Sequence, residues 1–162
     1  MAHGPRTKTC AECGRGFRHG RYRAYCSSRC ERAASVKVIA RREAARAVVG
    51  VALGLELREV RLDRAAPDGD VQFSYPLAPD EAERAEAIAA IAGSLAEEAV
   101  SGRDPARRQS APRVDNQLGA RLLNEHRALV EEAAGVILGA SGSEDLAQEL
   151  TDLIRIRGHR GT

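Results

Sequence analysis

The sequence predicts a mainly α-helical protein that begins with a small cysteine-rich unit. All 4 cysteines fall within residues 10–30 of the 162-residue chain. Over much of residues 79–162, apolar residues recur every three or four positions, as they do in amphipathic helices. Leu, Ile, Val and Phe together make up only about a fifth of the chain, so we expect a small core that needs help from a metal, a partner or self-association.

Charge is divided unevenly along the chain. Residues 1–46 contain 12 Arg or Lys against 3 Glu, whereas residues 47–162 contain 13 basic against 20 acidic residues. A basic head and an acidic remainder predict two parts with different partners, the head meeting an anionic surface such as DNA or RNA. The abundance of Ala, Arg and Gly is typical of a high-GC bacterial or phage genome.

The N-terminus has no apolar run before its first cysteine, and no stretch is long and apolar enough to span a bilayer. These features predict a cytoplasmic protein with no membrane partner. Because the cytoplasm is reducing, the clustered cysteines are interpreted as metal ligands instead of disulfides.

The cysteines form two pairs with metal-ligand spacing. Cys10 and Cys13 make a C-x2-C pair followed by Gly14, which permits a tight turn around an ion. Cys26 and Cys30 lie four residues apart and share one face if a helix begins there. Four thiolates predict one tetrahedral Zn²⁺, and they leave no open position for a catalytic water, so the zinc is expected to be structural.

A helix is expected to begin at the second pair, because Ser28 and Glu31 have the spacing of a capping box. Between the pairs, residues 16–25 predict a short hairpin whose aromatic side chains cover the metal. His19 in this loop is expected to be a turn residue. A knuckle, a hairpin and a helix with the last two ligands together form a treble-clef arrangement.

Residues 10–30, CAECGRGFRHGRYRAYCSSRC, resemble small treble-clef zinc fingers of the FCS and MYM type. They are also similar to the zinc proteins of the bacterial DNA gyrase inhibitor family. The resemblance covers residues 8–34 and implies that Cys10, Cys13, Cys26 and Cys30 ligate the metal. Members of this group bind RNA, DNA or other proteins, so the resemblance does not select one partner. Gyrase inhibitors are little more than the finger, whereas this chain continues far beyond it.

Basic residues surround the cysteines and predict contact with phosphate, which Arg and Lys bind without regard to base sequence. The candidate nucleic-acid contacts are Arg15, Arg18, Arg21, Arg23, Arg29 and Arg32. Lys37, Arg41, Arg42 and Arg46 continue the basic run along the expected helix. The alternative is a solvated finger, or one that docks an acidic protein surface.

The rest of the chain divides into a connector and a helical tail. Residues 1–46 are assigned to the finger and its helix, and residues 47–78 to the connector. In the connector, residues 55–63 either prolong the helix or pair with residues 71–75 in a β-hairpin across the turn sequence APDGD; the hairpin is favoured.

The tail, residues 79–162, is expected to be a bundle of helices. These are a helix over residues 79–100, a flexible basic linker over 101–113, one helix over 118–140, and a last helix opened by Ser141 and Glu144. Narrow Ala and Leu seams suit antiparallel packing, or a homodimer formed through the tail.

No motif of an enzyme stands out. His126 lies in the apolar seam of the tail and is expected to be an ordinary interface residue. The leading hypothesis is a non-enzymatic zinc-finger protein that binds nucleic acid and uses its helical tail for dimerisation or regulation. The alternative is a protein–protein interaction module or an inhibitor of a DNA-processing enzyme.

Overall fold

The computed structural model of the protein describes residues 7–18, 24–101, 112–140 and 145–158. These residues form a mainly helical fold with two antiparallel hairpins, as predicted. In chain order the elements are β1 (Thr7–Thr9), β2 (Gly16–Arg18), α1 (Ser28–Ala52), β3 (Glu56–Asp63), β4 (Asp68–Ser74), α2 (Pro79–Ser101), α3 (Arg113–Glu125), α4 (Arg127–Gly139) and α5 (Leu146–Gly158).

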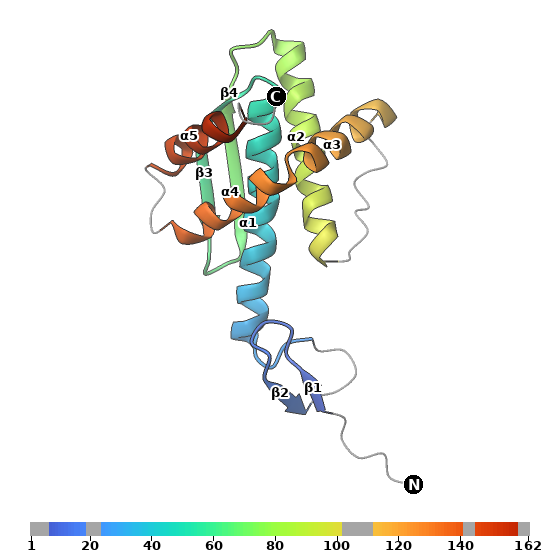
Figure 1. Cartoon of the computed structure of the whole chain (residues 1–162), viewed down its shortest axis with the longest axis vertical. Coiled ribbons are helices and arrows are strands. Elements are labelled where there is room, and N and C mark those ends of the chain that lie inside the picture. The colour runs from blue at the N-terminus through green and yellow to red at the C-terminus, as the bar shows by residue number, and fades with distance from the viewer. Residues whose placement is uncertain (1–6, 19–23, 102–111, 141–144, 159–162) are drawn as a thin grey trace.

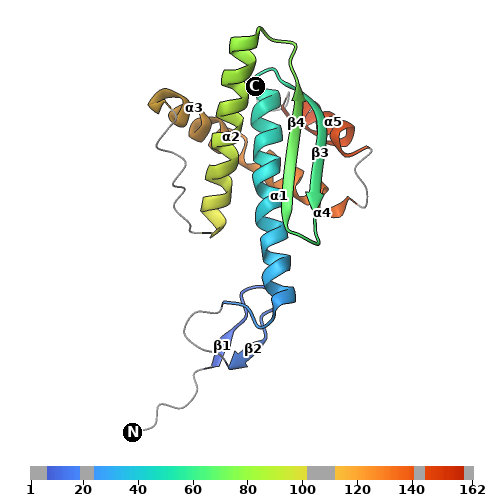
Figure 2. The same cartoon turned by 180° about the vertical axis from the view of Figure 1, so that it is seen from behind.

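The molecule consists of a small knob and a larger body joined by α1 (Figure 1). The knob, which we call the finger, comprises the described residues up to Ala34 and holds β1, β2 and the first turns of α1. The body has two layers: α2, α1 and the β3–β4 hairpin lie side by side, and α3, α4 and α5 cross them on one face (Figures 1 and 2). The finger therefore projects from the body on an extension of α1.

Helix α1 belongs to both units. Its first turns are exposed or half-buried, whereas most of its residues from Val36 to Gly50 face the body and are buried. The predicted boundary between residues 46 and 47 falls inside this continuous helix. The helix ends where Gly54 takes a positive φ of 91°, a conformation that favours glycine.

The hairpin predicted in the connector is present as β3 and β4, but its turn is earlier than predicted: residues 64–67 form the turn, and Asp68, Gly69 and Asp70 of APDGD belong to β4. Val60 on β3 is paired with Val71 on β4, and both are buried against α1 together with Phe73. The Asp63 carboxylate closes the turn by accepting hydrogen bonds from the backbone N–H groups of residues 65 and 66 at 2.8 and 3.1 Å. Gly50 lets the Phe73 ring approach α1, because a Cβ at this position would lie 2.5 Å from the ring carbons.

The helix predicted over residues 118–140 is two helices, α3 and α4, which meet at His126. The backbone of His126 has φ −103° and ψ 16°, and this departure from helical geometry lets α3 pack on α2 while α4 packs on α1. The predicted start of the last helix, at Ser141 and Glu144, lies outside the described residues, as does most of the predicted linker.

Alanine makes the close packing of the body possible. The buried side chains of α2 are mostly Ala, and a Cβ on Gly93 of α2 would lie 3.1 Å from the Arg42 backbone oxygen, so the backbones of α1 and α2 approach closely. Larger residues, among them Val130, Ile137 and Leu150, complete the core from α4 and α5. The core is small, as expected from the composition.

A charged side chain lies at the centre of the packing. Glu43 on α1 is fully buried, and its carboxylate accepts hydrogen bonds from Arg42 at 2.6 Å and Arg46 at 2.9 Å. The two arginines also donate to the backbone carbonyls of Gly69 and Val71 on β4. Desolvation lowers the pKa of Arg42, but the charge and hydrogen bond of Glu43, with weaker help from acidic residues on β4 and α2, raise it overall.

Candidate metal centre

The first cysteine pair lies in the turn between β1 and β2. The Gly14 N–H donates to the Cys10 carbonyl and the Cys10 N–H to the Arg15 carbonyl, both at 2.9 Å, and Gly14 has a φ of 71°. The observed hairpin differs from the one predicted over residues 16–25, because its strands flank the first cysteine pair instead of following it. Residues 19–23 lie outside the described part of the chain.

The second pair is positioned by the start of α1. Ser27, one residue before the predicted Ser28, is the N-cap: its Oγ accepts a hydrogen bond from the Cys30 N–H at 3.2 Å. This contact corrects the predicted capping box and leaves Cys30 in the first turn of the helix. Cys26 stands just before the cap, so the two sulfurs face the same side.

The four sulfurs converge on one point. All four Sγ atoms lie within 4.8 Å of one another, and the Cys13–Cys26 and Cys26–Cys30 pairs are 3.5 Å apart. A tetrahedral ion with metal–sulfur bonds of about 2.3 Å would set its ligands about 3.8 Å apart. The cluster can therefore hold a metal ion.

The environments of the sulfurs favour a bound cation. Cys10 is buried, and its Sγ accepts a hydrogen bond from the Cys26 N–H at 3.3 Å. Backbone hydrogen bonds, chiefly from Cys13, lower the pKa of the Cys10 thiol to about 6 despite its burial. Without a metal, hydrogen bonds with the Cys13 thiol and then with Cys30 raise the pKa of Cys26 to about 12. Sulfurs this close resist ionising together unless a cation compensates their charge.

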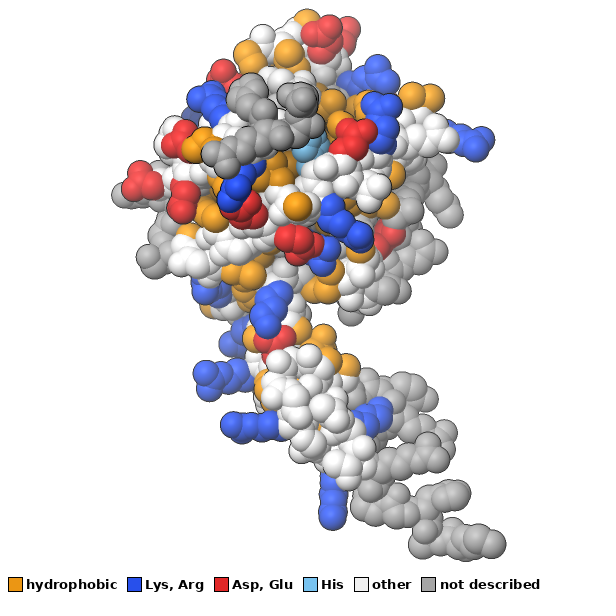
Figure 3. Space-filling model, viewed as in Figure 1, with side chains coloured by type: hydrophobic (Ala, Val, Ile, Leu, Met, Phe, Trp, Pro, Cys, Tyr) orange, Lys and Arg blue, Asp and Glu red, His pale blue; other side chains and the backbone are white. Residues whose placement is uncertain are grey.

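Four of the six candidate nucleic-acid contacts are described, and all four are exposed: Arg15, Arg18, Arg29 and Arg32. None of them forms an ion pair with a described residue. Arg21 and Arg23 lie outside the described residues. Figure 3 shows basic side chains projecting from the finger and the first part of α1, with little acidic surface between them.

The basic residues that follow along α1 are engaged in ion pairs, although Lys37 is itself exposed. Arg41 pairs with Glu131 of α4, and Arg42 and Arg46 pair with the buried Glu43. Lys37 pairs with Glu12 of the finger. These side chains join the parts of the molecule together, and the exposed cations are concentrated nearer the cysteines.

His126 occupies a different place from the metal centre. It is half-buried at the junction of α3 and α4, beside a hollow of about 610 Å³ that also borders Glu125, Glu132 and Arg157. Arg157 and Glu132 pair with each other at 3.2 Å. The imidazole forms no hydrogen bond with a described residue.

None of the helices in the described ranges has both the length and the apolar character needed to cross a bilayer. Comparisons of the chain with protein-family models, with curated proteins and with solved structures found no match. Its function is therefore inferred from its own residues.

Proposed function

We propose that this chain is a non-enzymatic zinc-finger protein that binds nucleic acid through its finger. The observation that carries the proposal is the cluster of four cysteine sulfurs in a unit whose described arginines are exposed and have no acidic partner among the described residues.

Zn²⁺ is the ion that suits the cluster best. Thiolates are soft ligands, and four of them in a tetrahedron are typical of structural zinc. Because all four ligands come from the protein, no coordination position is left for water, and the ion serves to fold the finger. The finger would then be the treble-clef type that its sequence resembles.

Phosphate contact follows from the surface charge. Arg15 and Arg18 come from the hairpin side of the finger and Arg29 and Arg32 from the first turns of α1, so cations from two elements flank one metal centre. Each guanidinium can bind a phosphate with paired hydrogen bonds and releases counterions when it does so. The finger stands clear of the body, which leaves room for a long polyanion (Figure 1).

Salt titrations of the zinc-loaded full chain with random duplex and single-stranded DNA and RNA test this proposal. We expect log affinity to fall steeply with log salt. Changing Arg15, Arg18, Arg29 and Arg32 to Gln should weaken binding at least tenfold at low salt and flatten the slope by about 0.9 for each lost duplex phosphate contact, with zinc content unchanged.

A control variant with the same change in charge uses exposed arginines of the body, Arg58, Arg113, Arg121 and Arg155. It should keep nearly full affinity. The proposal is wrong if the wild type fails to bind at low salt, or if the control loses as much as the finger variant. A nuclease-treated pull-down that still recovers one stoichiometric protein would favour the protein-interaction alternative.

A further inference from the structure

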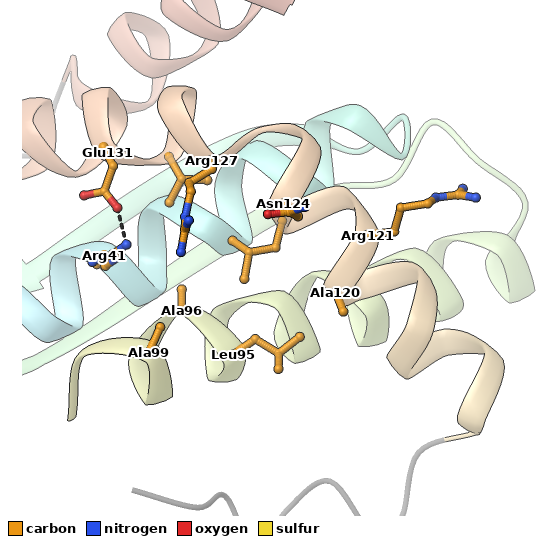
Figure 4. A pocket seen from close by; sticks show the side chains of 11 residues that line it. Arg41, Leu95, Ala96, Ala99, Ala120, Arg121, Asn124, Arg127 and Glu131 are labelled. Atoms are coloured by element: carbon orange, nitrogen blue, oxygen red, sulfur yellow. Dashed lines mark ion pairs between the residues drawn. The ribbon is translucent and has the colours of Figure 1, made fainter. Parts of the chain in front are cut away.

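A cavity of about 480 Å³ opens between α1, α2 and the α3–α4 junction (Figure 4). It lies in the body and is separate from the metal centre. Its volume falls in the range of small-molecule sites. The proposed role of the finger makes no use of it.

One side of the cavity is apolar. Leu95, Ala96 and Ala99 of α2 form this wall, and Leu123 and Val130 extend it from α3 and α4. The alanines leave space where longer side chains would meet the facing helices. An occupant that follows this wall must itself be largely apolar.

The opposite side carries guanidinium groups. Arg127 of α4 points across the cavity toward Ala96 (Figure 4), and it forms no ion pair with a described residue. Arg41 of α1 pairs with Glu131, but its Nε is buried and has no hydrogen-bond partner. A third arginine, Arg121, is at the rim, where it pairs with Glu125 at 3.5 Å.

Two lining arginines offer hydrogen-bond donors at the cavity: Arg127, which is exposed and has no ion pair with a described residue, and Arg41, whose buried Nε has no acceptor. A buried N–H without an acceptor carries an unrecovered desolvation cost, and an unpaired guanidinium beside an apolar wall favours an anion. Arg41 already pairs with Glu131, so Arg127 is the guanidinium that remains to bind a carboxylate. We propose that the cavity binds a small amphipathic carboxylate, with its head at Arg127 and its apolar tail along Leu95, Ala96 and Ala99.

Calorimetric titration of the full chain with octanoate, and with 1-octanol as the uncharged match, tests the proposal. We expect octanoate to bind with one-to-one stoichiometry at millimolar or lower concentration and octanol to bind at least tenfold more weakly. Arg127→Gln should weaken octanoate binding about tenfold, the effect of losing a charged hydrogen bond. Ala99→Phe, at an exposed position that borders the cavity, should block it by filling the space.

Arg155→Gln, an exposed change outside the cavity, is the control and should bind octanoate like the wild type. Because Arg127 is exposed and unpaired with described residues, its replacement should leave the melting temperature unchanged, which separates lost binding from lost fold. The proposal is overturned if octanoate does not bind at millimolar concentration, if octanol binds equally well, or if Arg127→Gln binds octanoate like the wild type.

Discussion

The finger and the body are stabilised by different means, although they share one helix. In the described part of the finger only Cys10 is buried, whereas the body buries side chains from all its helices and from its hairpin. A unit without a core depends on its cross-link, and a unit with a core depends on packing. This difference means that the two units should fail independently and under different treatments.

Removal of the metal should have the largest effect. Changing all four cysteines to serine, or chelating zinc, should unfold the finger, because zinc binding contributes on the order of 10 kcal/mol to folding of such sites. Hydrogen exchange should then become fast at residues 7–18 and 24–34 and stay slow at Val48 and Leu150 in the body. Unfolding of the whole chain on chelation would contradict the independence of the two units.

Loss of the buried carboxylate should have the converse effect. Glu43→Ala leaves Arg42 and Arg46 without their main partner and should destabilise the body by about 3 kcal/mol, measured by urea unfolding. The matched change Glu59→Ala removes a surface partner of Arg61 and should cost less than about 1 kcal/mol. Zinc content should be unchanged in both variants. Loss of zinc from Glu43→Ala would show that the finger depends on the stability of the body.

Two helical glycines should respond oppositely to the same substitution. Gly50→Ala places a methyl group 2.5 Å from the Phe73 ring and should destabilise the body by about 1–3 kcal/mol. Gly135→Ala meets no atom within 4 Å and should stabilise α4 by about 0.5–1 kcal/mol. Thermal unfolding of the two variants measures both effects. If both melting temperatures shifted in the same direction, the close approach of the Phe73 ring to Gly50 would not determine the stability of the body.

The smallest effect is expected at the cap of α1. Ser27→Ala removes the acceptor for the Cys30 N–H and should weaken zinc binding about fivefold, which corresponds to about 1 kcal/mol for a lost N-cap. Ser28→Ala should change it little, because Ser28 is already inside the helix. Competition with a zinc-binding dye measures the zinc affinity of both variants. A larger loss of affinity for Ser28→Ala than for Ser27→Ala would indicate that Ser28 is the N-cap, as the sequence predicted.

Local features of the chain could be predicted from the sequence. The two cysteine pairs are close in sequence, so their spacing alone predicts that the four sulfurs share one ion. The β3–β4 hairpin was predicted from alternating residues beside APDGD, although Asp68, Gly69 and Asp70 of this sequence lie in β4 and not in the turn. The cap was misplaced by one residue because Ser27 and Ser28 are adjacent and Glu31 made Ser28 the better match to the motif.

Features that depend on distant partners could not be predicted. The basic run of α1 suggested an exposed, unpaired charge. In the structure Arg41 pairs with Glu131 of α4, and Arg46 pairs with Asp70 of β4. The break between α3 and α4 falls at a histidine with no proline or glycine beside it, and the apolar period continues across it. Only packing on two different helices reveals the bend.

The unbroken course of α1 has a mechanical consequence. The helix passes from the finger to the body at Ala34 and Ser35 without a break, so its phase at this point fixes the direction in which the finger faces. One residue added there would swing the finger by about 100° around the helix axis and lift it by about 1.5 Å. Four added residues would bring it back to within about 40° of its original facing, so a partner touching both units would tolerate the longer insertion better than the shorter one.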